Sequence, residues 1–165
     1  MSRRYYVLHE TGNTNHYTGL IEFCREKDIV VVFYEFALFY QAKKTIKKVD
    51  IRLFFKLFSN LLFLFLFIFS RRKTIILGAA PFDWGMLYFG FLAKRHNFYY
   101  HSSWVHWSGT NVPKKKSFSI LNKLIKQSWK IFLEQRCKGI FAVSRRTEKQ
   151  LLNYYNISCP IQVVN

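Results

Sequence analysis

Polar side chains follow four apolar runs of the sequence, each at the point where a predicted strand ends. The runs are Tyr5–His9, Thr74–Gly78, Phe98–Tyr100 and Gly139–Val143. Histidine, carboxylate and hydroxyl groups in such places can exchange protons with a substrate or hold a polar ligand. The candidates are Glu10, Gly12, Asn13 and His16 after the first run, Asp83 after the second, His101, Ser102 and Ser103 after the third, and Ser144 and Arg145 after the fourth.

Three of these residues, His101, Glu10 and Asp83, are candidate acids or bases, and the others are candidate binding residues. A histidine with its ordinary pKa near 6.5 can take or give a proton at neutral pH. Each candidate also has a structural alternative, because Asn13 and Asp83 can cap helices and His101 can be a hydrogen-bonded rim histidine. The sequence contains no G-x-G-x-x-G, G-x-x-x-x-G-K-[ST] or G-x-S-x-G motif, so those nucleotide and hydrolase sites are unsupported.

The elements between the candidates alternate between strand and helix. Ile29–Tyr34 is a continuous apolar run, typical of a strand covered on both faces. Helical spacing places Tyr17, Leu20, Ile21 and Cys24 on one face of a helix. The same spacing predicts a helix over Ser119–Arg136 with Leu121, Ile125, Trp129 and Phe132 inward, and Asp83 is expected to cap another that runs to Arg95. We predict one α/β domain over residues 1–165, a doubly wound, mostly parallel, Rossmann-like sheet whose carboxyl ends bring the candidates together.

The last part of the chain shows this plan most clearly. Ser144 directly follows an apolar strand and precedes a charged segment, so it is predicted to N-cap a helix. Asn156 is predicted as a left-handed C-cap, and a further strand is expected over Ile161–Val164. The inward stripe of this helix is expected to consist of Leu151, Leu152 and Tyr155.

One segment, Arg52–Phe69, is dense in Phe and Leu. Lys56, Ser59 and Asn60 interrupt it, so a buried or interface-lying helix is favoured over a membrane-spanning one. Basic residues flank it on both sides: Lys43, Lys44, Lys47 and Lys48 before it, in a stretch predicted to be helical, and Arg71, Arg72 and Lys73 after it. This arrangement predicts an anionic membrane surface as a partner.

Composition limits the remaining possibilities. The 165 residues carry 26 Lys and Arg against 9 Asp and Glu, a formal net charge of +17, so the partner class is acidic. Cys24, Cys137 and Cys159 are widely spaced and odd in number, which argues against a disulfide framework and a zinc site and indicates a reducing cytosol. The basic start of the chain turns polar too early for a signal peptide, so export is not expected.

Taken together, the strand and Gly-bearing loop at the start, the strand before His101-Ser102-Ser103, and the Val143-Ser144 helix followed by a short strand resemble the N-terminal domain of family 4 glycosyltransferases of the GT-B fold. The resemblance implies the acceptor-side half of an enzyme that transfers a sugar from a nucleotide donor to a membrane-associated or lipid-linked glycan acceptor. It aligns Gly12 with the loop over the donor phosphates, although Asn13 stands where the family commonly has a second glycine. His101 aligns with the histidine of an H-[TS] sequence at the reaction centre.

The resemblance has further implications. No metal or cofactor is expected, since GT-B enzymes hold the donor diphosphate with protein groups and helix N-termini. The nucleotide sugar is a substrate. The family's E-x7-E donor site belongs to a second domain that does not appear before Asn165, so we expect this chain to be inactive alone or completed by a donor-domain polypeptide in trans. The expected location is cytoplasmic, peripheral on the inner face of the membrane.

Two other functions are compatible with the sequence. The charge of +17 and the interleaved aromatics would suit a nucleic-acid-binding module. The basic residues instead lie on predicted helix faces and beside the Phe-rich segment, and no recognisable motif is present, so nucleic acid is disfavoured. A non-catalytic, membrane-bound partner subunit is the second alternative.

Overall fold

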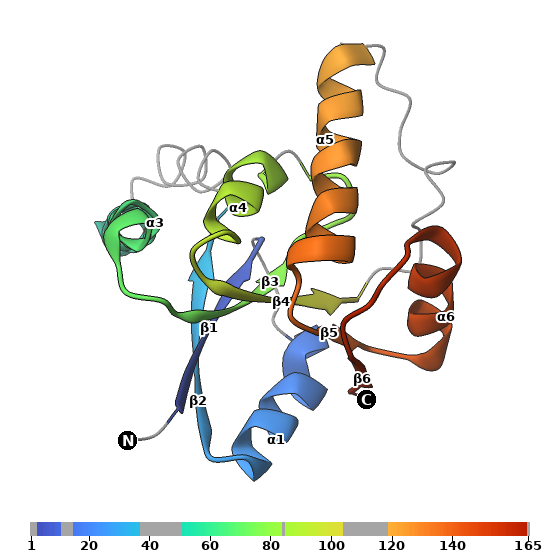
Figure 1. Cartoon of the computed structure of the whole chain (residues 1–165). Helices are drawn as coiled ribbons and strands as arrows, with labels where there is room; N and C mark the ends of the chain where they lie inside the picture. Colours follow the sequence, from blue (N-terminus) through green and yellow to red (C-terminus); the bar gives the residue numbers. More distant parts are fainter. Residues whose placement is uncertain (1–2, 11–14, 37–50, 84, 104–118, 165) are drawn as a thin grey trace.

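The computed structural model describes residues 3–10, 15–36, 51–83, 85–103 and 119–164 (Figure 1). Their six strands form one sheet in the order β2-β1-β3-β4-β5-β6, and every neighbouring pair is parallel. This confirms the predicted α/β, Rossmann-like fold. The strands are β1 (Arg3–His9), β2 (Ile29–Glu35), β3 (Thr74–Gly78), β4 (Asn97–Ser102), β5 (Ile140–Ala142) and β6 (Ile161–Val163).

Helices cover both faces of the sheet. In Figure 1, α1 lies below the sheet, whereas α3, α4 and α5 lie above it. Leu151 of α6 belongs to the same core as α4 and α5. The helical elements are η1 (Asn15–Tyr17), α1 (Thr18–Glu26), α3 (Ile51–Phe69), α4 (Met86–Leu92), α5 (Ser119–Ile131), the π-helical turn η2 (Phe132–Arg136) and α6 (Arg145–Tyr154).

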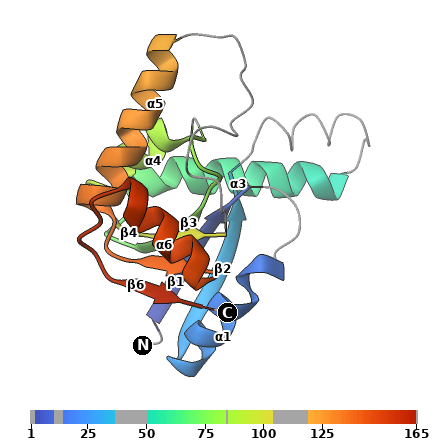
Figure 2. The same ribbon diagram turned by 90° about the vertical axis from the view of Figure 1, so that its right-hand side faces the viewer.

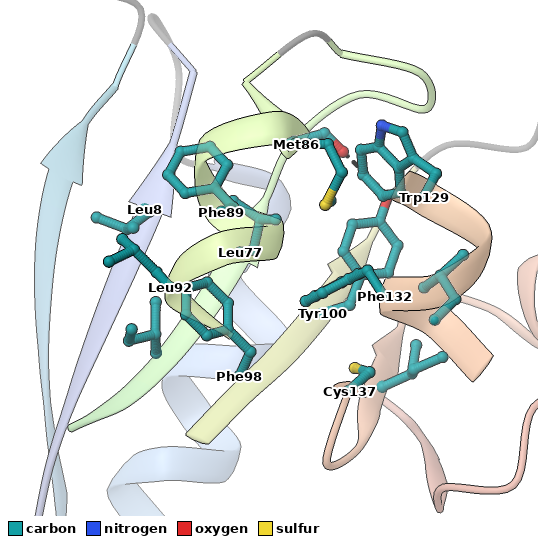
Figure 3. Packing of buried hydrophobic residues seen from close by; sticks show 14 of the residues in the cluster. Leu8, Leu77, Met86, Phe89, Leu92, Phe98, Tyr100, Trp129, Phe132 and Cys137 are labelled. Atoms are coloured by element: carbon teal, nitrogen blue, oxygen red, sulfur yellow. Dashed lines mark hydrogen bonds between the residues drawn. The ribbon is translucent and has the colours of Figure 1, made fainter. Parts of the chain in front are cut away.

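The larger core is built on aromatic side chains between β4, α4 and α5 (Figure 3). The rings of Tyr100 and Trp129 meet edge to face with centroids 5.5 Å apart. Both polar ends are satisfied, because Trp129 Nε1 donates to the carbonyl of Asp83 at 3.1 Å and Tyr100 Oη donates to the carbonyl of Ala79 at 3.0 Å. The α5 stripe is confirmed for Ile125, Trp129 and Phe132, but Leu121 is 44% exposed.

Strand β2 corrects one expectation. Its apolar sequence predicted a strand covered on both faces, yet only Ile29 is buried and Val30 is 44% exposed. The reason is topology: in the described sheet β2 stands at the edge and pairs with β1 alone. An apolar run therefore identified a strand but not its place in the sheet.

The β5–α6–β6 unit forms as predicted, with two corrections. Leu151 is buried, but Leu152 is 50% exposed because adjacent residues on a helix point about 100° apart. The helix does not end on a left-handed Asn156. Tyr155 takes an extended conformation there and packs against the larger core, and the described non-glycine residues with positive φ are Asp28 and Phe82.

The N-cap of α6 is confirmed. Ser144 has extended backbone, and its side-chain oxygen accepts a hydrogen bond from the Thr147 amide at 3.2 Å. We expect Ser144→Ala to lower the free energy of unfolding by about 1 kcal/mol, the usual cost of losing such a cap. Urea denaturation measures this directly. Ser144→Asp, which keeps an acceptor at the cap, should lose much less; equal stability of Ser144→Ala and the parent would show that the cap contributes nothing.

Pairing of β5 with β6 also brings together two cysteines that are far apart in the sequence. Cys137 precedes β5 and Cys159 precedes β6, and the two thiols lie close enough to affect each other's ionisation, while Cys137 Sγ donates to the Gly139 carbonyl at 3.1 Å. Both are free thiols. The nearby Cys137 thiol lowers the pKa of Cys159 to about 7, whereas burial raises the pKa of Cys137.

Candidate functional site

The candidate site lies at the carboxyl ends of β1, β3 and β4. The strand order reverses between β1 and β3, and in open parallel sheets ligands bind outside the carboxyl ends of the strands at such a point. Glu10 directly follows β1 and accepts a hydrogen bond through Oε1 from the Ala80 amide, which follows β3, at 2.7 Å. The Glu10 carboxylate therefore connects the segment after β1 to the segment after β3, the two strands between which the strand order reverses.

His101 lies on β4, the neighbour of β3 in the sheet, and its position in that strand differs from the prediction. The strand was expected to end at Tyr100, whereas β4 continues to Ser102 through its pairing with β5. His101 and Ser102 are therefore strand residues, and the prediction that they open a loop was wrong. The His101 ring is 1% exposed and lies under Tyr17 and His16, with ring centroids 4.4 Å and 5.9 Å away.

Burial fixes the charge of His101. It lowers the pKa of the imidazole from 6.5 to about 3, and the nearby His16 acts in the same direction. The ring is neutral at physiological pH, with one nitrogen that can donate and one that can accept a hydrogen bond. Within the described ranges neither ring nitrogen has a hydrogen-bond partner. Because buried polar atoms are normally satisfied, a polar ligand is the natural partner to consider.

Tyr17 completes this arrangement, although the sequence suggested only a core position on a helix face. It is fully buried at the junction of η1 and α1, and its hydroxyl donates to the carbonyl of Gly78 at 3.5 Å. Burial, with Glu10 nearby, raises the pKa of its hydroxyl, so Tyr17 stays protonated. The one signal in the sequence is its position directly after the polar loop that follows β1.

Gly78 allows Tyr17 to approach the end of β3. A Cβ atom at residue 78 would lie 1.6 Å from Tyr17 Oη and 2.7 Å from its Cζ. Because Tyr17 is buried and has no room to move away, we expect Gly78→Ala to cost about 1–3 kcal/mol of stability in urea unfolding. The cost should shrink in a Tyr17→Phe background, which removes the nearer atom. An equal cost in both backgrounds would mean that this clash is not the cause.

Asp83 faces the same edge from the turn after β3. It was expected to cap the following helix, but α4 begins later, with Gly85 as its N-cap, and ends earlier, at Leu92. Its Oδ1 instead accepts from the Gly85 amide at 2.7 Å. Burial raises the pKa of the carboxyl, the Gly85 hydrogen bond opposes this, and Glu10 adds to the rise. The negative charge of Glu10 thus acts on the Asp83 carboxyl.

The other candidates divide into several groups. His16 is exposed beside His101, and Ser102 is buried in β4, where its carbonyl accepts from the Val143 amide at 3.2 Å. Ser103 is half-buried just beyond β4. Ser144 uses its oxygen as the α6 cap, and Arg145 is exposed at the start of that helix. Gly12 and Asn13 lie outside the described residues, as do Lys43, Lys44, Lys47 and Lys48.

The structure thus places His16 and His101 against Tyr17, with Glu10 nearby, whereas Asp83 follows β3 near Glu10 and accepts a hydrogen bond from Trp129 of α5 through its carbonyl. In the described part of the chain, no three His, Cys, Asp or Glu side chains are placed to share a metal ion. The resemblance to family 4 glycosyltransferases is a prediction that comparison with known proteins does not test. No protein-family model, curated protein or solved structure matches this chain.

Proposed function

We propose that the chain is the acceptor-side half of a GT-B-type glycosyltransferase, which moves a sugar from a nucleotide donor to a membrane-associated or lipid-linked glycan acceptor. The observation that carries the proposal is His101. Its neutral ring lies at the carboxyl edge of a parallel sheet, and neither nitrogen has a partner among the described residues. A sugar hydroxyl that both donates and accepts a hydrogen bond suits such a ring, and because the ring is 1% exposed, the exposed His16 side chain would have to move aside to admit it.

The low pKa of His101 suggests which role each residue has. An imidazole with a pKa of about 3 is a weak proton acceptor at neutral pH, so in our proposal it orients the acceptor hydroxyl. The proton would then pass to a carboxylate, for which Glu10 and Asp83 are the candidates at this edge. Burial raises the pKa of the Asp83 carboxyl, which strengthens Asp83 as a base.

Helix α3 supports a membrane-associated acceptor. It is long and apolar enough to cross a membrane, judged by length and composition. Among the side chains of α3 that the structure describes, Asn60, Leu64 and Phe67 are buried and form a narrow stripe. The side chains that are large, apolar and exposed on this helix are Ile51, Phe54, Phe55, Phe58, Leu61, Leu62, Phe65, Leu66 and Phe69. An apolar outer face of this size suits the interior of a lipid surface better than water.

Contacts along the C-terminal half of α3 favour an orientation flat on the membrane. Its carbonyls accept hydrogen bonds from Tyr88 Oη at Leu64, from His96 Nε2 at Phe67 (3.0 Å) and from Arg95 Nη2 at Phe69 (3.4 Å). Figure 2 shows α3 along its full length. A spanning helix would have to give up these contacts, so we propose a peripheral protein on the cytoplasmic face of the membrane.

The test is sugar transfer by the full-length protein in the membranes of an expressing host that also supplies the nucleotide-sugar domain, in the same polypeptide or in trans. These membranes are incubated with a panel of radiolabelled nucleotide sugars, and the lipid extract is separated by thin-layer chromatography. We expect one donor to label a lipid-extractable product above the level of membranes from a host that carries the empty vector. If no donor gives such a product while the protein is membrane-bound, the chain is a non-catalytic membrane subunit and the proposal fails.

A further inference from the structure

We propose that a basic pocket at the amino edge of the sheet binds the phosphate of an anionic lipid headgroup. The pocket, of about 430 Å³, lies at the opposite ends of β1 and β3 from the candidate site. It is lined by Arg3, Arg4, Tyr5, Tyr6, Arg72, Lys73 and Thr74. The lipid source of the phosphate rests on the membrane association proposed above, but it does not depend on sugar transfer.

Strand pairing brings the cations of this pocket together. Tyr5 of β1 pairs with Thr74 of β3, so Arg4 and Lys73, which directly precede them, lie at neighbouring strand ends. Lys73 Nζ lies 3.5 Å from the Tyr6 hydroxyl and 4.8 Å from the centre of the Tyr6 ring, which holds the ammonium group in place.

The pocket carries positive charge that no carboxylate among its described lining residues neutralises. Four of its lining residues are Arg or Lys, and none of the described lining residues is a carboxylate. Cations after a helix C-terminus can simply complement the helix dipole, as Arg72 and Lys73 after α3 would. That reading leaves out Arg3 and Arg4, which come from β1. Because side chains alternate along a strand, Arg4 lies on the same face of β1 as Tyr6, beside which Lys73 is held, and its guanidinium group is suited to bidentate recognition of phosphate.

Helix α3 places the pocket beside the proposed lipid surface. Tyr6, in the pocket wall, packs against Phe63 and Phe67 of α3 with ring centroids 5.7 Å and 6.3 Å apart. Phe69, the last residue of α3, is 67% exposed, and the chain passes from it directly to Arg72 and Lys73. The apolar face and the pocket are therefore adjacent, as the acyl and headgroup layers of a membrane are.

Two variants with equal net charge test the pocket. Arg4→Gln/Arg72→Gln removes two cations from the pocket, and Arg146→Gln/Lys149→Gln removes two exposed cations from α6. Binding of the full-length protein to vesicles of phosphatidylcholine with phosphatidic acid is measured by co-sedimentation. We expect the pocket variant to bind roughly 30-fold more weakly. The α6 variant should lose only a few-fold, since its charges act through general attraction alone.

Each outcome is informative. Equal losses in the two variants, or no loss in either, would overturn the pocket and leave general attraction as the explanation. Calorimetric titration with glycerol 3-phosphate and inorganic phosphate separates the sources of the phosphate. Binding of these soluble probes as tight as that of vesicles would overturn the lipid assignment. Sugar transfer is a separate measurement, so loss of the pocket and loss of the proposed activity are distinguishable.

Discussion

Replacing Phe58 and Phe65 by serine is expected to weaken binding to anionic vesicles by roughly 100-fold or more. The two side chains are 56% and 57% exposed, and their spacing of seven residues places them on the same outer side of α3. Moving each ring from water into an apolar environment contributes roughly 1.5–3 kcal/mol, which the serine variant loses. Co-sedimentation of the purified full-length protein with vesicles measures the change.

The matched control for this variant is Leu152→Ser/Tyr154→Ser. These two side chains are 50% and 51% exposed on α6, so the control removes a similar amount of exposed apolar surface from another helix. It should bind vesicles like the parent. Because the side chains of Phe58 and Phe65 are exposed, urea unfolding of that variant should also stay close to the parent. Unchanged vesicle binding by Phe58→Ser/Phe65→Ser would contradict the proposed membrane face.

The second large effect is the loss of folding stability at acidic pH that burial of His101 is expected to cause. An unfolded histidine takes up a proton as the pH falls below about 6.5, but the buried ring resists protonation until the pH reaches about 3. Stability from this residue is therefore fully present above pH 6.5 and is lost as the pH falls toward 3, by about 1.4 kcal/mol per pH unit. His101→Phe removes the titrating group and keeps a ring beside Tyr17.

Urea unfolding at pH 7.5 and pH 5 checks this prediction. Between these two pH values the parent should lose about 2 kcal/mol more stability than His101→Phe. Other titrating groups, including the buried His96, are common to both proteins and cancel in the difference. Parallel profiles for the parent and His101→Phe would show that His101 is protonated as readily in the folded protein as in the unfolded one.

Local pattern was enough to predict most of the fold. The apolar runs that became β1, β3, β5 and β6 are short and are bounded by polar or charged residues or lie beside a proline or glycine turn, and the Ser144 cap needs only contacts within its own turn. The predictions were wrong where an element far away in the sequence determines the length or exposure of a strand. β4 reaches Ser102 because β5 pairs with it, and β2 is half-exposed because its place in the sheet is at the edge.

The candidate site was predictable only in outline. That polar residues would gather at the carboxyl edge follows from parallel strands, and Glu10 and Asp83 do follow β1 and β3 there, whereas His101 is buried within β4. The packing of Tyr17 against both Gly78 and His101 joins residues far apart in the chain, and so does the basic pocket of Arg4 and Lys73. Both depend on strand register and helix docking, about which spacing along the sequence carries no information.

The most direct test of the proposed function compares His101→Phe with the parent in the sugar-transfer assay of the full-length protein. If His101 orients the acceptor hydroxyl, kcat should fall by roughly 100-fold or more. Vesicle binding and urea unfolding at pH 7.5 should stay near those of the parent. Should the phenylalanine variant fail to fold, His101→Gln serves in its place. A folded, membrane-bound variant that lacks the imidazole and still transfers sugar at the parental rate would contradict a role of this edge in catalysis.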